Sequence, residues 1–407
     1  MKTAVIYDKW LSGMGGGEVV TCTMAAALRD NGYRVTLLSK GKVTAGEIMA
    51  RLHIDITNID LTANPQFLTA NRKFDLFINT SFMDYTYGFA KKNIYYVHFP
   101  SAIRSGLFNY VLLFFQKTNL HSLFPKLIKE RVDDRLRAGI YPDMKKRLNS
   151  YDTFVTHSNY VAQWTKKYWN KDAKILYPPI NMKTEAVNKR SGETASVNEM
   201  AARQNWICSI GRFFTLGHGK KQEVMIEAFK RLTEAVKKTE GRGTASVENG
   251  LQLHLIGGIG NEPSSIRFIE KLKKMAAGYT VFFHLNAPRR EIESILRKSK
   301  VYWHAAGYGE NPKKNPIKFE HFGISPVEAV SAGCIPVLFN GGGLTEIIEL
   351  LGYDKGLHLF STIDDLVEKT IKILTNRKLI SLRTKTLDDN FSSSRFKERF
   401  MRIIEEI

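Results

Sequence analysis

Short apolar runs alternate with helical patterns along most of this chain, and that alternation is the sequence signal of doubly wound α/β domains. The first run leads through a glycine turn into a helical pattern that ends near Gly32. A first set of runs comprises TAVIYD, YRVTLLS, FDLFINT, NIYYVHFP and DTFVTHSN, and a second comprises WICSIGRF, LQLHLIGG, TVFFHL, KVYWHAA and CIPVLFN. We therefore expect two Rossmann-like α/β domains that face each other across a cleft.

Length and polarity set the expected domain boundaries. The 407 residues are too many for one ordinary core, and residues 183–205 are polar and lack aromatic side chains, as a linker should. We expect an N-terminal domain over 1–182, a linker over 183–205 and a C-terminal domain over 206–380. The segment 381–407 ends in a helical pattern. One interpretation is that this helix crosses back to the N-terminal domain.

The formal net charge of +20 raises the question of an anionic partner. Between residues 104 and 174 there are 14 Lys and Arg against 6 Asp and Glu, and large apolar residues accompany the basic ones over 104–140. This pattern fits a surface that rests on anionic lipid headgroups, and equally a core helix with a charged outer face. Nucleic acid is a less favoured partner, because no zinc-finger, helix-turn-helix or RNP pattern is present.

Other features argue for a cytoplasmic location. No run of about 18 apolar residues predicts a membrane span, and the first ten residues read as a strand and not as a secretory signal. The three cysteines are far apart and form no CxxC or Cys/His cluster, so neither a disulfide framework nor a zinc site is expected. A peripheral position on the inner face of a membrane remains compatible with the basic segment.

Ligands of such folds bind at the carboxyl ends of strands, so residues that follow strands are the first candidates. The glycine loop SGMGGGE (12–18) follows the first run and opens a helix, which makes Gly15 and Gly16 candidate contacts to a diphosphate, although a plain tight turn is equally compatible. The spacing is not that of the dinucleotide fingerprint. His98 ends the run IYYVHFP, where it could donate a hydrogen bond to a substrate hydroxyl or serve only as a core residue.

A second basic group follows the run WICSIGRF. Arg212 can bind phosphate oxygens through its forked guanidinium, and Lys220 or Lys221 can act as a point charge. Such cations would stabilise the negative charge that grows on a leaving nucleotide diphosphate. A structural role for the arginine is the alternative.

The stretch EHFGISPVE (320–328) holds two glutamates eight positions apart, a spacing that does not place them on one helix face. Ser325, Pro326 and Glu328 match a capping box, so the carboxylate of Glu328 could serve only to cap a helix. Glu320 has no comparable structural explanation. The bend also exposes the backbone N–H groups of three residues to a ligand, Phe322, Gly323 and Ile324.

At this point the residues carry a family resemblance. E-x7-E followed by a small-residue helix, AGCIPV and a glycine-rich turn resembles the signature of the retaining family 4 glycosyltransferases, which have the GT-B fold. GGGE, YYVHFP, THSNYV, LYPPIN and SIGRF extend the likeness over most of the chain. FHLNAPRREIESILRKS with EHFGISPVEAVSAG is similar to lipid-linked oligosaccharide mannosyltransferases of that family. Two departures are a longer spacing between Arg212 and its lysine, and an insertion over 307–319.

The resemblance implies a role for each matching residue. Glu320 corresponds to the glutamate that contacts donor-sugar hydroxyls, and Glu328 to the one that binds the ribose. Arg212 and Lys220, with Lys221 not excluded, correspond to the diphosphate clamp. The remaining matches are Gly15 and Gly16 over the phosphates, and His98 near the donor sugar and the acceptor hydroxyl.

The resulting expectation is a retaining hexosyltransferase, with mannose as the first guess for the sugar, in cell-surface polysaccharide or glycoconjugate assembly. Its partners would be a nucleotide-sugar donor and a glycan or polyprenyl-linked acceptor. We expect no metal and no other cofactor, because the cations can replace a divalent ion and no DxD-type motif follows a strand. The alternatives are a GT-B nucleotide-sugar epimerase or phosphorylase and, less favoured, a basic nucleic-acid-binding protein.

Overall fold

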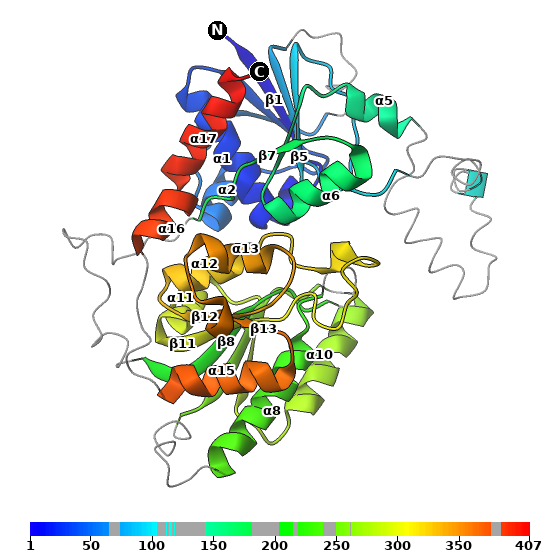
Figure 1. Cartoon of the computed structure of the whole chain (residues 1–407). Helices are drawn as coiled ribbons and strands as arrows, with labels where there is room; N and C mark the ends of the chain where they lie inside the picture. Colours follow the sequence, from blue (N-terminus) through cyan, green and yellow to red (C-terminus); the bar gives the residue numbers. More distant parts are fainter. Residues whose placement is uncertain are drawn as a thin grey trace. The chain divides into compact units, whose positions relative to one another are not determined.

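The computed structural model of the chain describes residues 1–64, 74–103, 143–180, 203–214, 219–238, 250–260, 262–375 and 384–407, together with 111, 114, 115 and 118. The chain divides into two compact units. The N-terminal unit comprises Met1–Pro179 and Ser393–Ile407, and the C-terminal unit comprises Ile180–Ser392 (Figure 1). Most of the expected linker, 183–202, lies outside the described residues, and strand β8 already begins at Gln204.

The N-terminal unit is built on a seven-stranded parallel sheet in the order β3-β2-β1-β4-β5-β6-β7. Its helices include α1 (Gly16–Asp30), α2 (Ala45–Leu52), α5 (Met144–Asn149) and α6 (Asn159–Trp169). The strands are β1 (Thr3–Tyr7), β2 (Arg34–Leu38), β3 (Asp60–Thr62), β4 (Leu76–Asn79), β5 (Lys92–Val97), β6 (Thr153–Thr156) and β7 (Ala173–Ile175). Their apolar runs are buried because a parallel sheet is covered on both faces.

The C-terminal unit repeats the plan with a six-stranded parallel sheet in the order β10-β9-β8-β11-β12-β13. The strands are β8 (Gln204–Ile210), β9 (Gln252–Gly257), β10 (Val281–Leu285), β11 (Ser299–His304), β12 (Ile335–Phe339) and β13 (Leu359–Phe360). The helices are α8 (Gln222–Lys238), α10 (Pro263–Ala276), α11 (Arg289–Lys298), α12 (Ile324–Ser331), α13 (Gly343–Leu350), α14 (Lys355–His358), α15 (Ile363–Thr375) and α16 (Thr384–Phe391). Two parallel α/β domains are thus confirmed.

Strand β11 shows how the alternation of side chains separates core from site. Val301 and Trp303 lie in the apolar core formed with α8 and α15, and the Trp303 indole donates to Thr370 of α15 at 3.0 Å. Successive residues of a strand point to opposite faces. Tyr302 and His304 therefore lie on the other face, where the Tyr302 hydroxyl reaches Ser325 of α12 at 3.0 Å. A polar pair is in this way buried beneath α12.

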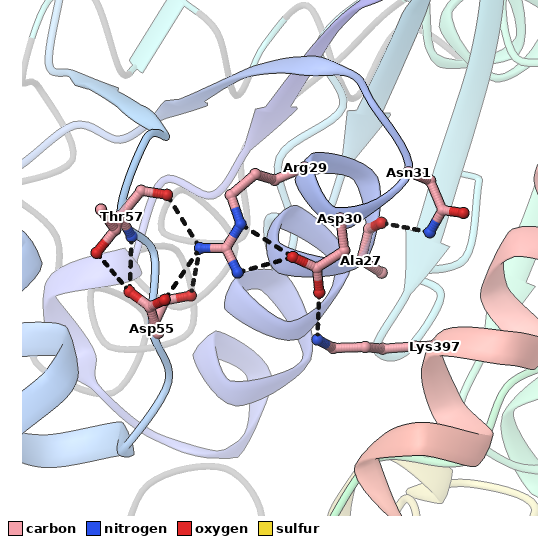
Figure 2. Close-up of polar contacts among 7 residues, drawn as sticks. All are labelled: Ala27, Arg29, Asp30, Asn31, Asp55, Thr57 and Lys397. Atoms are coloured by element: carbon pink, nitrogen blue, oxygen red, sulfur yellow. Dashed lines mark hydrogen bonds and ion pairs between the residues drawn. The ribbon is translucent and has the colours of Figure 1, made fainter.

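The last helix, α17 (Ser393–Glu405), belongs to the N-terminal unit although it follows the whole C-terminal unit in sequence. It lies against α1, and its apolar face completes the core of the N-terminal unit through Phe396, Phe400, Ile403 and Ile404 (Figure 1). Figure 2 shows its polar attachment: Lys397 contacts Asp30 at 2.7 Å, and Asp30 also binds Arg29. Arg29 in turn donates to the carbonyls of Asp55 and Thr57, so the attachment reaches the segment after α2.

Among the residues that the structure describes, no helix combines the length and the apolar character needed to cross a membrane. The basic segment 104–140 lies almost entirely outside these residues, and its expected amphipathic character therefore stays a prediction.

Candidate functional site

Charged side chains gather at the carboxyl end of the C-terminal sheet. Arg212 follows β8, Lys220 precedes α8, His304 is the last residue of β11, and Glu320 lies just before α12. In a parallel sheet these chain positions share one edge, which is where open α/β sheets bind their ligands. The structure brings three of these residues, Lys220, His304 and Glu320, into direct contact.

Glu320 is held at one of its two carboxylate oxygens. Lys220 Nζ donates to Glu320 Oε2 at 2.5 Å, and His304 Nε2 donates to the same oxygen at 2.6 Å. The Glu320 side chain is 11% exposed and that of His304 is fully buried. Within the described part of the chain, Oε1 of Glu320 has no protein partner. The protein thus fixes the carboxylate through one of its two oxygens.

The surroundings keep Glu320 ionised and His304 neutral. Burial works to raise the pKa of the Glu320 carboxyl, but the charge of Lys220 and the hydrogen bond from His304 hold that pKa well below its usual range. Burial lowers the pKa of the His304 imidazole, in spite of the neighbouring carboxylate. At neutral pH the cluster therefore holds Glu320 as a carboxylate and His304 as a neutral imidazole.

The other nitrogen of His304 lies beside the Tyr302 hydroxyl. Because Nε2 donates to Glu320, the neutral ring has an acceptor at Nδ1, and the Tyr302 hydroxyl lies 3.3 Å from it. The same hydroxyl lies 3.0 Å from Ser325 Oγ, and Ser325 Oγ donates to the Ile210 carbonyl at 3.3 Å. The Tyr302 hydroxyl donates to Ser325, so this buried polar chain joins β11 and α12 to the Ile210 carbonyl at the end of β8.

The structure distinguishes Lys220 from Lys221, the two adjacent lysines between which the sequence did not decide. The stem of Lys220 packs on Gly211, where a Cβ would lie 2.4 Å from its Cγ, so only glycine allows this approach. Lys221 turns elsewhere and contacts Glu310 at 2.8 Å. Lys220 is therefore the lysine that accompanies Glu320.

Arg212 is exposed at the end of β8. Its backbone carbonyl accepts a hydrogen bond from Gln222 at 3.1 Å, which anchors the loop to the start of α8. Its guanidinium has no ion pair with any residue that the structure describes. Among the described residues, Arg212 is thus an exposed cation at the end of β8 with no carboxylate partner.

The capping-box interpretation of Glu328 is wrong. Helix α12 begins at Ile324 and its N-cap is Gly323, in the left-handed region at φ 107°, with no side-chain cap. Ser325 lies inside the helix and its hydroxyl is used by Tyr302 and Ile210. The local sequence did match the motif, but this buried network competes for the serine.

Glu328 instead binds Arg289, the first residue of α11. Arg289 Nη1 donates to Glu328 Oε1 at 2.9 Å, and Arg289 Nε also contacts Glu293 at 3.0 Å. Burial raises the pKa of the Glu328 carboxyl, and the arginine only partly offsets this. Oε2 of Glu328 has no partner among the described residues. Like Glu320, Glu328 is thus fixed at one oxygen.

The bend between the two glutamates is held from both sides. The Phe322 side chain is buried against Phe391 of α16, with ring centroids 5.7 Å apart. The Gly343 N–H donates to the Glu320 carbonyl at 2.8 Å, so the glycine-rich turn before α13 supports the backbone of Glu320. The start of α12, at Gly323 and Ile324, therefore has a fixed position beside Glu320.

In the N-terminal unit, Gly15 is the N-cap of α1 and Gly16 its first residue. The Gly15 N–H donates to the carboxylate of Glu18 at 2.6 Å. An anionic ligand at Gly15 would have to displace this carboxylate, which the sequence argument did not foresee. The expected contact of Gly15 and Gly16 with phosphate stays a prediction.

His98 follows β5 in the N-terminal unit, and its ring lies against Gly17, where a Cβ would lie 3.1 Å from Cε1. Its Nε2 lies 2.7 Å from the Thr80 carbonyl, which can only accept, so Nε2 carries the proton. Burial lowers the pKa of the imidazole. In this tautomer the neutral ring offers an acceptor at Nδ1, and the expected role of His98 toward a substrate hydroxyl stays a prediction.

Sequence reasoning missed His304, Tyr302, Arg289 and Glu310. His304 did carry a signal, because it ends a β-rich run as His98 does. Arg289 carried none, since its partner is 39 residues away in sequence. Across the described ranges, no group of three His, Cys, Asp or Glu side chains is arranged to hold a metal ion.

With this geometry described, comparison with known proteins gives a consistent picture. Residues 193–386 match the family model described as "Glycosyl transferases group 1". A GDP-Man:Man(3)GlcNAc(2)-PP-Dol alpha-1,2-mannosyltransferase of Dictyostelium discoideum is 24% identical over 326 residues, which cover 77% of this chain and 58% of that protein. A protein of the same name from Xenopus laevis is 27% identical over 47% of this chain and 35% of its own length. The chain thus spans little more than half, or less, of these relatives.

Solved structures agree on the fold. A glycosyltransferase from Rickettsia africae superposes over 100% of this chain and 98% of its own, with a TM-score of 0.60 at 14% identity. Identity this low speaks for the fold alone. The chain therefore has the GT-B fold, and its residues 193–386 are similar to the glycosyltransferase group 1 family.

Proposed function

We propose that this chain is a retaining glycosyltransferase of family 4 that moves mannose from GDP-mannose to a lipid-linked glycan. The observation that carries the proposal is the pair of half-satisfied carboxylates, Glu320 and Glu328, on either side of the start of α12. Each is fixed by a cation at one oxygen and keeps the other for a ligand hydroxyl. The donor and acceptor classes rest on the names of the mannosyltransferase relatives.

The donor is held by hydroxyl and phosphate contacts. Glu320 Oε1 accepts from hydroxyls of the donor sugar, and Glu328 Oε2 accepts from the ribose. A lysine ammonium has three N–H donors, so Lys220 keeps two for the diphosphate while one remains on Glu320. Arg212 adds a forked contact to the same phosphates. The backbone N–H groups at the start of α12 favour the negative charge there.

The chemistry follows from this arrangement. Retaining glycosidases use one of two carboxylates as a nucleophile. Here Glu320 is tied to Lys220 and His304, and Glu328 is tied to Arg289, so neither is placed as a free nucleophile. The acceptor hydroxyl attacks the anomeric carbon from the face that the diphosphate leaves, the bond to the phosphate oxygen breaks, and that phosphate takes the hydroxyl proton. Lys220 and Arg212 stabilise the charge of the leaving group.

A binding panel tests the proposal directly. The full chain is titrated calorimetrically with GDP, UDP and ADP and with GDP-mannose and UDP-glucose, and thermal midpoints are measured in parallel. A bound donor stabilises the folded chain by mass action, by about 2.7 kcal/mol when its free concentration is a hundred times Kd. This stabilisation raises the thermal midpoint. We expect guanine nucleotides to bind most tightly. Binding of no nucleotide at all would end the proposal.

Metal removal should leave activity unchanged. If Lys220 and Arg212 stabilise the leaving group, transfer proceeds in EDTA at the rate seen in magnesium. The measurement is release of GDP with an acceptor glycolipid, in EDTA and in a magnesium or manganese series. Loss of activity in EDTA that either ion restores would show that a divalent cation carries this charge instead.

His98→Gln should reduce kcat by about tenfold, the scale of one lost hydrogen bond. The glutamine amide can still donate toward the Thr80 carbonyl, but it lacks the acceptor at Nδ1. His98→Asn is the matched variant, because its oxygen takes the place of Nδ1 while the bond to Thr80 is lost. We expect the asparagine variant to retain more activity. Equal losses with equal drops in melting temperature would assign His98 to packing.

We further propose that the chain acts peripherally on the cytoplasmic face of a membrane. A lipid-linked acceptor requires the enzyme to work beside a bilayer, and the basic residues of 104–140 supply attraction to anionic headgroups. A flotation experiment compares vesicles that contain phosphatidylglycerol with vesicles of phosphatidylcholine alone. If the protein floats with neither kind of vesicle, the proposed membrane association is excluded.

A further inference from the structure

The insertion over 307–319 places a second carboxylate beside the two lysines. Glu310 Oε1 lies 2.8 Å from Lys221 Nζ, and Glu310 Oε2 lies 3.2 Å from Lys318 Nζ. Asn315 Nδ2 also donates to Oε2 at 3.3 Å. The Glu310 side chain is 13% exposed. Burial opposes its ionisation, yet the two lysines lower its pKa, so it stays a carboxylate at neutral pH.

The backbone of Lys221 is strained at this point of the chain. Its φ is 57°, in the left-handed region that costs a non-glycine residue about 1 kcal/mol. Its carbonyl accepts from the N–H of Val224 and of Met225, so Lys221 also begins α8. Lys220 and Lys221 consequently send their ammonium groups to two different carboxylates of one loop, Glu320 and Glu310.

These two ion pairs fasten the segment before α8 to the loop before α12. If Glu310 were absent, Lys221 would lose this carboxylate, and Glu320, the partner of the adjacent Lys220, would be the carboxylate left to attract it. A second ammonium at Glu320 would compete for the oxygen that the donor sugar needs. The contact with Glu310 removes that competitor.

We propose that Glu310 is a positioning residue of the donor site: it holds Lys221 away from Glu320, so that Lys220 alone accompanies the catalytic carboxylate. The inference rests on the proposed function, because it assigns the insertion a part in binding the nucleotide sugar. Glu310 acts through Lys221 and need not touch the donor itself.

The test is a rescue experiment with GDP and GDP-mannose as probes, measured by calorimetry and by steady-state kinetics. We expect Glu310→Ala to weaken GDP-mannose binding by about tenfold, the scale of one charge-assisted contact. Adding Lys221→Gln to that variant removes the competing ammonium and should return affinity to within about twofold of wild type. A purely structural role of Glu310 would instead appear as a lower melting temperature of Glu310→Ala, restored by Lys221→Gln, with GDP-mannose affinity unchanged in both variants.

Controls separate the outcomes. Glu227→Gln, which breaks an exposed pair with Arg231 on α8, should leave affinity unchanged. Glu310→Gln serves if the alanine variant does not fold, and it is combined with Lys221→Gln in the same way. Unchanged affinity in the Glu310 variants, or a loss that Lys221→Gln does not restore, would overturn this inference. Failure of the wild-type chain to bind any nucleotide would instead overturn the proposed function.

Discussion

Glu320→Gln is expected to lower kcat by about a thousandfold, the upper range for removing one electrostatic contact to a transition state. The amide has the size of the carboxylate but no charge, so the donor hydroxyls lose a charged acceptor. The oxocarbenium-like state also loses a nearby negative charge. The measurement is single-turnover transfer from the donor, with substrate saturating so that binding does not limit the rate.

The same substitution leaves Lys220 without its partner, and this would destabilise the fold for a reason unrelated to catalysis. The double variant Glu320→Gln with Lys220→Gln separates the two effects, because it removes the unpaired charge. We expect it to recover part of the melting temperature and none of the activity. If transfer persists in Glu320→Gln while stability falls, Glu320 is a structural ion-pair partner and the catalytic assignment fails.

Glu328→Gln is expected to weaken donor binding by about a hundredfold with little change in kcat, because charged hydrogen bonds to the ribose contribute about 1.5–3 kcal/mol each. A ribose contact is the same in the ground state and the transition state, so its loss appears in KM. Initial rates over a donor concentration series, with calorimetric titration of GDP, measure the effect.

The matched control is Glu293→Gln, which removes the other carboxylate that binds Arg289. Because Glu293 is not placed in the donor site, donor KM should stay within about twofold of wild type. If Glu328→Gln lowers the melting temperature and leaves donor KM unchanged, then Glu328 serves only to join α11 to α12 through Arg289. That outcome would also remove one of the two carboxylates on which the proposed function rests.

The fold could be predicted from the sequence because parallel strands leave a strong local signal. Runs such as TAVIYD and CIPVLFN are mostly apolar, and the structure places them in sheets covered on both faces. The positions of candidate residues followed from the same signal, since Arg212 and Glu320 were sought after strands. Boundaries were less accurate: β8 begins at Gln204, two residues before the expected C-terminal domain.

The partners of the site residues could not be predicted, because they are distant in sequence. Ser325 and Glu328 match a capping motif locally, yet each is used by a residue from another element, Tyr302 and Arg289. The spacing along the chain favoured Lys220 over Lys221 as the site lysine. In the structure Lys221 contacts Glu310 instead, and that residue is 89 positions away in sequence. The sequence also could not predict which nitrogen of His98 carries the proton, because this depends on the carbonyl of Thr80.

The position of α17 has a consequence for the order in which the chain can fold. Domains usually form as units while the chain is being synthesised, the N-terminal one first. Here the side chains of Phe396 and Phe400 complete the core around α1, yet they are made after all of residues 180–392. The N-terminal unit therefore keeps an uncovered apolar face until α17 has been synthesised. Its closing step comes last, after the C-terminal unit has had time to fold.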